Sequence, residues 1–263
     1  FLTAEPDAAP FFHRWIGSDE FINGIERWCL WLGDVPPARL RAMPKTLERV
    51  QAVKAFRSGS RRKQTLAAAK RPAHFGTELI PQTPYLVLPK VSSERRVFVP
   101  IGFMAADTFC SDLVFMLPNA TPYHFGILTS TMHNAWVRST CGRLESRYRY
   151  SAAIVYNNFP WPEAPSDAQR AAVEAAAQAV LDARAMFPDA TLADLYDPLT
   201  MPPALLKAHH KLDAAVDAAY GKKPGAFKSD AERVAFLFER WQALASLLPA
   251  APAKRPRRTA PAG

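Results

Sequence analysis

The chain has 263 residues and a formal net charge of +9, because 33 lysines and arginines outnumber 24 aspartates and glutamates. With 49% hydrophobic and 22% charged residues, the composition is typical of a folded protein and excludes a largely disordered one. The sequence has no apolar run of about eighteen residues, which excludes a membrane-spanning helix, and its first residues lack the pattern of a signal peptide.

The three cysteines, Cys29, Cys110 and Cys141, lie too far apart for a CxxC motif, and their odd number argues against a disulfide framework. We therefore expect a protein of the reducing cytoplasm. The first residue is Phe1 rather than Met, so we expect the chain to be a piece of a longer protein.

The first part of the chain carries both helix and strand signals. Basic and apolar residues alternate after a Pro-Pro turn in a pattern that favours a helix, and the Ser58-Gly59-Ser60 break ends it. Short runs of β-branched and aromatic residues favour strands. The sequence predicts helices over 38–57 and 124–138, strands over 85–88, 96–101, 113–117 and 150–156, and a loop or helix start over 61–65.

A proline-rich string at 159–165 divides the chain, because successive X-Pro units cannot continue a helix or a central strand. Beyond it, Ser166 and Gln169 form a capping-box pattern. Apolar residues then recur at the three-to-four spacing of helices. The sequence predicts helices over 168–186, 202–219 and 229–247, the last with Leu248 on its apolar face, and a Pro/Ala/Lys/Arg-rich disordered end.

We therefore predict an α+β fold. A mixed β-sheet domain with flanking helices would occupy residues 1–162, a small all-α domain residues 163–248, and a disordered basic tail residues 249–263.

Positive charge is concentrated in three places. Residues 39–71 hold eleven basic residues and one acidic residue, Glu48. Four arginines at 138–149 are interleaved with tyrosines, and four more basic residues lie at 254–258. Such a concentration is typical of proteins that bind a polyanion, most commonly DNA or RNA. The alternative for residues 39–71 is a solvated helix face.

Motifs of catalysis are missing from the sequence. It has no GxxxxGK[ST] or GxGxxG phosphate loop, no GxSxG elbow and no HExxH metal pair. His209 and His210 fall on a helical stripe, where one ring is expected to pack and the other to face solvent. Residues 157–160 superficially suggest the Asn-Pro-Pro-aromatic motif of amino-methyltransferases, but the order is wrong, so we interpret them as a structural turn. We predict no catalysis, cofactor or metal for this chain alone.

A short polar segment offers the chemistry of sequence-specific DNA recognition. Arginine reads guanine in forked geometry, and glutamate accepts from cytosine. Glu94 and Arg96 are two residues apart, so an extended backbone would project both to one side. The alternative is an ordinary charged hairpin turn. Arg61, Arg62, Lys63 and Thr65 could hold phosphates or bases, although a bare basic run is nonspecific.

Several segments resemble one family. They are FINGIERWCLW at 21–31, PKVSSERR at 89–96 with VPIGF at 99–103, FGILTSTMHNAW at 125–136, GRLESRYRYS at 142–151, VYNNFPWP at 155–162, and LADLYD at 192–197 with Met201-Pro202 and Ala208-His209. Together they resemble the target recognition region and helical C-terminal domain of bacterial MmeI-like (type IIL) restriction–modification enzymes and related DNA adenine methyltransferases. The likeness covers roughly residues 10–248.

The resemblance implies that this chain selects a double-stranded DNA sequence. An upstream methyltransferase domain of the same polypeptide would bind S-adenosylmethionine and methylate adenine N6. By the resemblance, base reading falls first on Glu94 and Arg96 and second on Arg61, Arg62, Lys63 and Thr65. Contacts to the DNA backbone are assigned to Lys90, Ser92, Ser93 and Arg95. Contacts to phosphates, or a role in holding the fold, are assigned to Arg143, Arg147, Arg149 and Ser151.

Four tryptophans, Trp28, Trp31, Trp136 and Trp161, are expected in the core. Two further functions stay open from the sequence: a nucleic-acid-binding protein without base preference, and a protein-interaction module whose basic patch docks an acidic partner.

Overall fold

The computed structural model describes residues 1–76 and 78–246. The predicted basic tail at 249–263 and Leu248 lie outside the described residues. Within the described part, strands form three small three-stranded sheets, and the residues after 166 are helical. The expected α+β class is confirmed. None of the described helices combines the length and the apolar character needed to cross a membrane.

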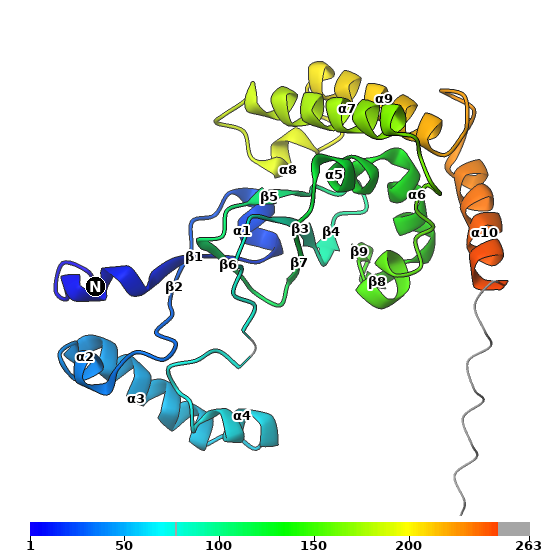
Figure 1. Cartoon of the computed structure of the whole chain (residues 1–263). Coiled ribbons are helices and arrows are strands. Elements are labelled where there is room, and N and C mark those ends of the chain that lie inside the picture. The colour runs from blue at the N-terminus through cyan, green and yellow to red at the C-terminus, as the bar shows by residue number, and fades with distance from the viewer. Residues whose placement is uncertain (77, 247–263) are drawn as a thin grey trace, which may run out of the picture.

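The first sheet lies at the N-terminal end and has the order β2-β1-β6. Strand β1 pairs antiparallel with β2 and parallel with β6. Three helices inserted between β2 and β3 extend away from the rest of the molecule, and we call residues 37–68 the basic arm (Figure 1). The elements are η1 (Pro6–Phe11), β1 (Phe12–Ile16), α1 (Ser18–Asn23), β2 (Trp28–Leu30), α2 (Pro37–Arg41), α3 (Pro44–Ser58), α4 (Lys63–Ala68) and β6 (Thr108–Cys110).

The second sheet is central and antiparallel, with the order β5-β3-β7. All five residues of β3 are buried, in keeping with its uninterrupted apolar run. The third sheet has the order β4-β9-β8, and it joins the end of β3 to a hairpin far along the chain. The elements are β3 (Tyr85–Pro89), β4 (Val91–Ser92), β5 (Gly102–Met104), β7 (Val114–Pro118), α5 (Pro122–Thr129), α6 (Thr131–Thr140), β8 (Gly142–Leu144) and β9 (Arg147–Arg149).

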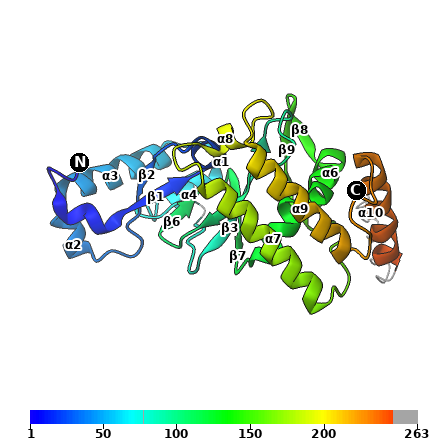
Figure 2. The same ribbon diagram turned by 90° about the horizontal axis from the view of Figure 1, so that it is seen from above.

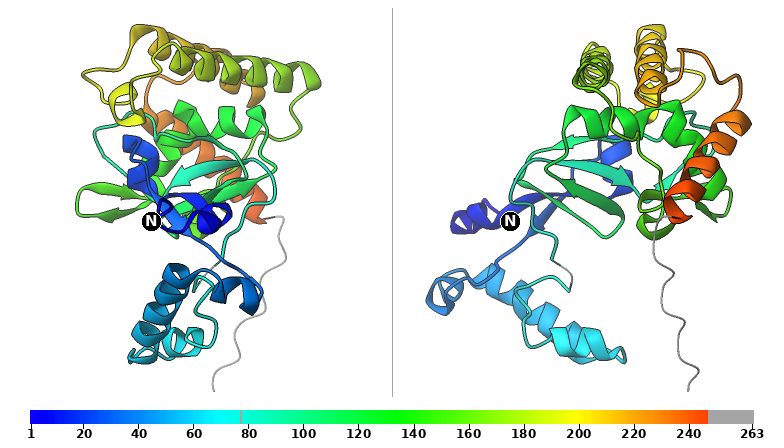
Figure 3. Two further views of the ribbon diagram at one scale, coloured as in Figure 1. Left: turned by 90° about the vertical axis from the view of Figure 1, so that its left-hand side faces the viewer. Right: turned by 45° about the vertical axis from the view of Figure 1, so that its right-hand side comes forward.

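The C-terminal helices pack on the central sheet through α5, as Figures 2 and 3 show. The predicted capping box is confirmed, because Ser166 N donates to Gln169 Oε1 at 2.8 Å and Gln169 N donates to Ser166 Oγ at 3.3 Å. One core of buried side chains runs from Leu86 of β3 to Leu237 of α10. The elements are η2 (Ala152–Tyr156), α7 (Asp167–Ala185), α8 (Leu192–Leu195), α9 (Pro203–Ala219) and α10 (Asp230–Ser246).

Two predicted strands are wrong. Residues 96–101 form an irregular segment, and β5 begins only at Gly102. Residues 150–156 contain a π-helical turn, whose carbonyls at Ala153 and Ile154 accept hydrogen bonds from Asn158 Nδ2 at 2.7 and 3.0 Å. A short apolar run does not distinguish a strand from any other buried segment, because apolar side chains are buried in both. A turn follows at Asn157 and Asn158, as expected for residues 157–160.

Smaller differences follow from local chemistry. The helix expected over 38–57 is broken before Pro44, which has no N–H to continue a helix. The helix expected over 124–138 divides at Ser130, which caps α6. Trp136 is 2% exposed, as expected of a core residue, whereas Trp28 is 51% exposed on the edge strand β2. The expectation of a buried Trp28 is therefore wrong.

Candidate nucleic-acid interface

Glu94 and Arg96 lie on a tight turn rather than on the extended segment expected. Arg96 N donates to Ser93 O at 3.3 Å, and we call residues 93–96 the recognition turn. Glu94 is exposed and Arg96 is half-buried. The turn follows directly on β4, whose partner β9 fixes its position.

The Arg96 guanidinium lacks an acceptor in the part of the chain that the structure describes. Its Nε is shielded from solvent and makes no hydrogen bond. Burial lowers the pKa of Arg96, although the nearby Asp197 carboxylate opposes this. A half-buried charged donor without a partner is costly, so such groups are typical of sites that are completed by a ligand. Arg96 is therefore suited to donate hydrogen bonds to an acceptor from outside the chain.

Glu94 faces the hairpin formed by β8 and β9. The pKa of Glu94 lies below its ordinary value because its own backbone N–H, the Ser146 hydroxyl and the charges of Arg143 and Arg147 favour the carboxylate. The side chain therefore stays ionised and acceptor-only near neutral pH. Glu94 and Arg96 thus place an acceptor and donors on the same turn, in the area next to the hairpin.

The arginines of the hairpin surround this area. Arg143 lies over the Tyr148 ring at 4.1 Å and donates to Ser146 O at 3.1 Å, and Arg147 pairs with Glu145 at 2.8 Å. The hairpin arginines are exposed. The structure brings the following predicted residues to the β4–β9–β8 sheet and its turns: Lys90, Ser92, Ser93, Glu94, Arg95, Arg96, Arg143, Arg147 and Arg149.

Ser151 has a structural position at the start of the π-helical turn, where its carbonyl accepts from Val155 N at 2.8 Å. Tyr148 and Tyr150 are buried at 8% and 5% exposure. These rings pack rather than face the surface, so base stacking by either tyrosine is excluded in this structure.

The other predicted residues lie on the basic arm. Arg61, Arg62 and Lys63 are exposed at the beginning of α4, and Thr65 is half-buried. Of the fifteen residues of α3, only Thr46 is buried in the described structure, and Phe56 is 79% exposed. The structure therefore does not bring residues 61–65 to the recognition turn. They form a second, separate basic surface on elements with little core of their own (Figure 3).

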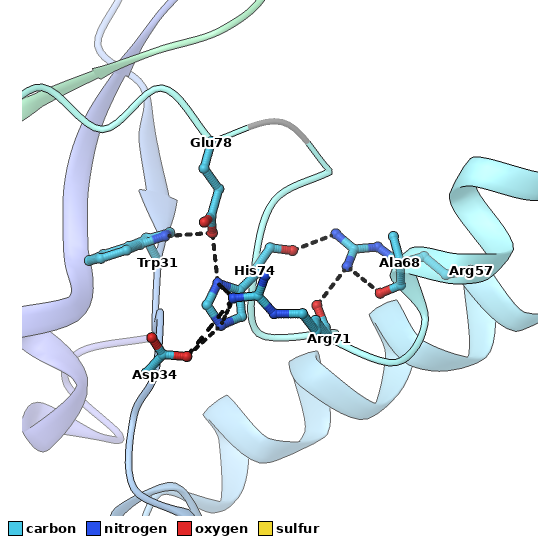
Figure 4. Close-up of polar contacts among 7 residues, drawn as sticks. All are labelled: Trp31, Asp34, Arg57, Ala68, Arg71, His74 and Glu78. Carbon is cyan, nitrogen blue, oxygen red and sulfur yellow. Dashed lines mark hydrogen bonds and ion pairs between the residues drawn. The ribbon is translucent and has the colours of Figure 1, made fainter.

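Two of the basic residues counted in 39–71 build the arm itself. Arg57 donates to the carbonyls of Ala68, Arg71 and His74 at 3.1, 3.0 and 2.8 Å, which holds α3 against the segment after α4 (Figure 4). Arg71 and His74 in turn contact the chain at the base of the arm. This arrangement sets the position of residues 61–65.

The base of the arm is tied to the body by His74. Its ring contacts Asp34 at 3.1 Å and Glu78 at 2.9 Å, and Trp31 Nε1 donates to Glu78 at 3.2 Å (Figure 4). The N-terminus of α3 is capped by a residue far away in the sequence. The Glu5 carboxylate accepts from Lys45 N and Thr46 N at 2.9 and 2.8 Å. Both ties join residues about forty positions apart.

Sequence reasoning missed the side chains that hold the segment after the recognition turn. Asn134 of α6 accepts from Val99 N at 2.8 Å, and Arg138 of the same helix donates to Val97 O at 2.7 Å. From α7, Arg184 donates to Ile101 O at 2.7 Å. These helical side chains satisfy backbone groups that a strand would pair in a ladder, which is the physical reason that the predicted strand is absent.

Two rings complete this support. His209 of α9 stacks on Phe98 with ring centroids 4.0 Å apart, and Tyr196 OH lies 2.9 Å from His209 Nε2. Burial lowers the pKa of His209 well below its ordinary value, so this ring is neutral. His209 is buried and His210 exposed, as predicted from the helical stripe. Within residues 1–76 and 78–246, no group of three His, Cys, Asp or Glu residues could hold a metal ion.

Two family models match the chain: the MmeI target recognition domain over residues 1–163 and the MmeI C-terminal domain over residues 164–249. The chain belongs to the MmeI family. A solved structure of the Type IIL restriction-modification enzyme MmeI in complex with DNA is 49% identical, with a TM-score of 0.90 over 94% of this chain and 33% of that chain. DNA methyltransferase A of Bacillus subtilis (strain 168) is 41% identical over 237 residues.

That alignment covers 90% of this chain and 26% of the relative. The chain therefore spans a third or less of the length of these relatives. The resemblance to the MmeI target recognition region is confirmed by the family models. The roles assigned to individual residues stay predictions.

Proposed function

We propose that this chain recognises a specific sequence in double-stranded DNA on behalf of an adenine-N6 methyltransferase of the MmeI type. The observation that carries the proposal is the recognition turn, where an ionised Glu94 and a half-buried Arg96 without an acceptor stand beside exposed arginines. The similarity to an MmeI structure in complex with DNA supports the same conclusion.

Base reading falls to Glu94 and Arg96. A carboxylate accepts from the amino group of cytosine, and a guanidinium donates to guanine O6 and N7, so the pair suits a C·G base pair. The exposed hairpin arginines and Lys90 would contact phosphates, which fix the register of a protein on the duplex without reading sequence.

The basic arm would supply a second contact with the duplex. Arg61, Arg62 and Lys63 project from elements with little buried surface, as expected of a part that packs on a partner. In our assignment these three residues and Thr65 contact bases or phosphates some way along the DNA from the recognition turn.

Chemistry on the DNA would belong to the remainder of a longer polypeptide. Its methyltransferase domain would use S-adenosylmethionine, as the similarity to DNA methyltransferase A supports. The sequence here has no glycine-rich cofactor motif, so we assign no residue of this chain to the cofactor. We propose a cytoplasmic location, with the recognition domain at 1–162 and the helical domain at 163–248.

The test is a charge exchange at the recognition turn. Glu94→Lys combined with Arg96→Asp keeps the net charge and swaps acceptor for donor, so the preferred base pair at one position of the bound sequence should change. The matched control is Asp189→Lys with Lys207→Asp, which exchanges two exposed charges in the helical part. Sequence preference is read by selection from a randomised duplex pool. An unchanged preference in the Glu94/Arg96 variant refutes the assignment.

The same experiment separates the other two functions. A nucleic-acid-binding protein without base preference would select no sequence, and its affinity would fall with salt equally for all duplexes. A protein-interaction module would retain no duplex at all at physiological salt.

A further inference from the structure

A hollow of about 430 Å³ lies between helix α1 and the recognition turn. One wall comes from β4, β9 and the recognition turn, and the opposite wall comes from α1. The polar residues that line it are Ser18, Asp19 and Asn23 on one side and Ser92, Ser93, Arg96 and Arg147 on the other.

The α1 wall presents hydrogen-bond acceptors. Asp19 and Asn23 are four residues apart and so share one face of the helix. Asn23 Nδ2 donates to Asp19 Oδ1 at 2.5 Å and to Asp19 O at 3.2 Å. This leaves Asp19 Oδ2 and Asn23 Oδ1 without a donor among the residues that the structure describes. Both side chains are exposed, so their free oxygens are available to a ligand.

The opposite wall presents donors. Arg96 has no acceptor within the described chain, and Arg147 uses one of its nitrogens for Glu145 at 2.8 Å. Ser92 is only 4% exposed, and its Oγ likewise has no partner among the described residues. Neither Ser92 Oγ nor Arg96 Nε is reached by solvent, so a ligand in the hollow would be contacted by the remaining donors of Arg96 and Arg147 rather than by these two atoms.

The mixture of donors and acceptors selects the kind of ligand. A DNA phosphate carries only acceptors, so the Asp19 carboxylate would repel it. The major-groove edge of a base pair carries both kinds: an amino group on cytosine or adenine, and acceptors such as guanine O6 and N7. The edge of a base pair therefore fits the hollow, and a phosphate does not.

We propose that Asp19 and Asn23 are specificity-determining residues that accept from the amino group of a cytosine or adenine, beside the base pair read by Glu94 and Arg96. This inference rests on the proposed function and adds α1 to the surface that reads DNA. It also assigns the hollow as the place where the edge of a base pair enters. Arg96 would then contact both this base pair and the one read with Glu94.

The variant Asp19→Asn tests it with the least disturbance, because the amide keeps the shape and can still accept from Asn23. It turns one free acceptor into a donor. We expect this variant to lose about tenfold or more of its discrimination at one base pair and to keep its preferences elsewhere. Asn23→Ala should weaken discrimination at the same pair. Asp189→Asn, which removes an exposed carboxylate from the helical part, is the matched control.

The measurement is the affinity of the 263-residue chain for its selected duplex and for duplexes with each alternative base pair at each position. If the hollow took a phosphate, Asp19→Asn would tighten binding to all duplexes equally, and this result overturns the proposal. Unchanged affinities for every duplex overturn it too. Should the wild-type chain select no sequence, the proposed function itself fails. A wild-type preference that responds to Glu94 and Arg96 but not to Asp19 leaves only this inference refuted.

Discussion

Replacement of Arg184 by Met should destabilise the protein by about 3 to 5 kcal/mol. The guanidinium donates to Ile101 O and, through Nε, to Tyr196 OH, both at 2.7 Å, and both acceptors belong to buried residues. Hydrogen bonds from a charged donor contribute about 1.5 to 3 kcal/mol each. Their loss leaves Ile101 O unpaired, while Tyr196 OH keeps its contact with His209 Nε2. Methionine keeps most of the apolar stem, so the cost comes from the polar contacts.

The assay is urea denaturation of the wild-type chain and the variant, compared at equal m-values. Arg170→Met is the matched control on the same helix. Arg170 is exposed and lies over the Tyr123 ring at 5.0 Å, a contact worth about 0.5 to 1 kcal/mol. A loss below about 1 kcal/mol in the Arg184 variant would refute the conclusion that α7 holds the segment after the recognition turn.

Three further outcomes are expected. Burial lowers the pKa of His133 to about 4, whereas its value in the unfolded chain is near 6.5. The unfolded state therefore binds more protons, and the free energy of unfolding falls by about 2 kcal/mol between pH 7 and 5. The variant His133→Gln should lose less stability over this range, as measured by acid denaturation. Gly126→Ala should cost about 1 to 2 kcal/mol in thermal unfolding, since its Cβ would lie 2.8 Å from Val173 Cγ1, although alanine favours the helix. Ser166→Ala removes the cap of α7 and should cost about 1 kcal/mol, measurable by urea denaturation, with no change in DNA affinity.

Helices with a local signal could be predicted well. The Ser166–Gln169 box and the apolar stripe of α9 act within a few residues, so neighbouring sequence contains the cause of the structure. The apolar runs of β3 and β7 are predicted for the same reason. Strands β1, β2 and β6 were not predicted, because each is short and becomes a strand only through its partners.

The candidate site was predicted in part. Residue types indicated Glu94 and Arg96 as an acceptor and donor pair but left an ordinary charged turn open, and the family resemblance put the pair first. The residues around the hollow on α1 carry no such signal. The sequence assigned no role to Asp19 or Asn23, and only the position of α1 beside the turn brings them to the hollow.

The sequence by itself determined where positive charge is concentrated, where the three long C-terminal helices form and which residues could read a base. Only the tertiary structure decided that residues 96–101 are irregular, since side chains of α6 and α7 take the hydrogen bonds that a strand would need. It also decided that Glu5 caps α3 across forty residues and that residues 61–65 lie apart from the recognition turn. Such contacts depend on distances between segments far apart in the chain, and those distances exist only after the core has formed.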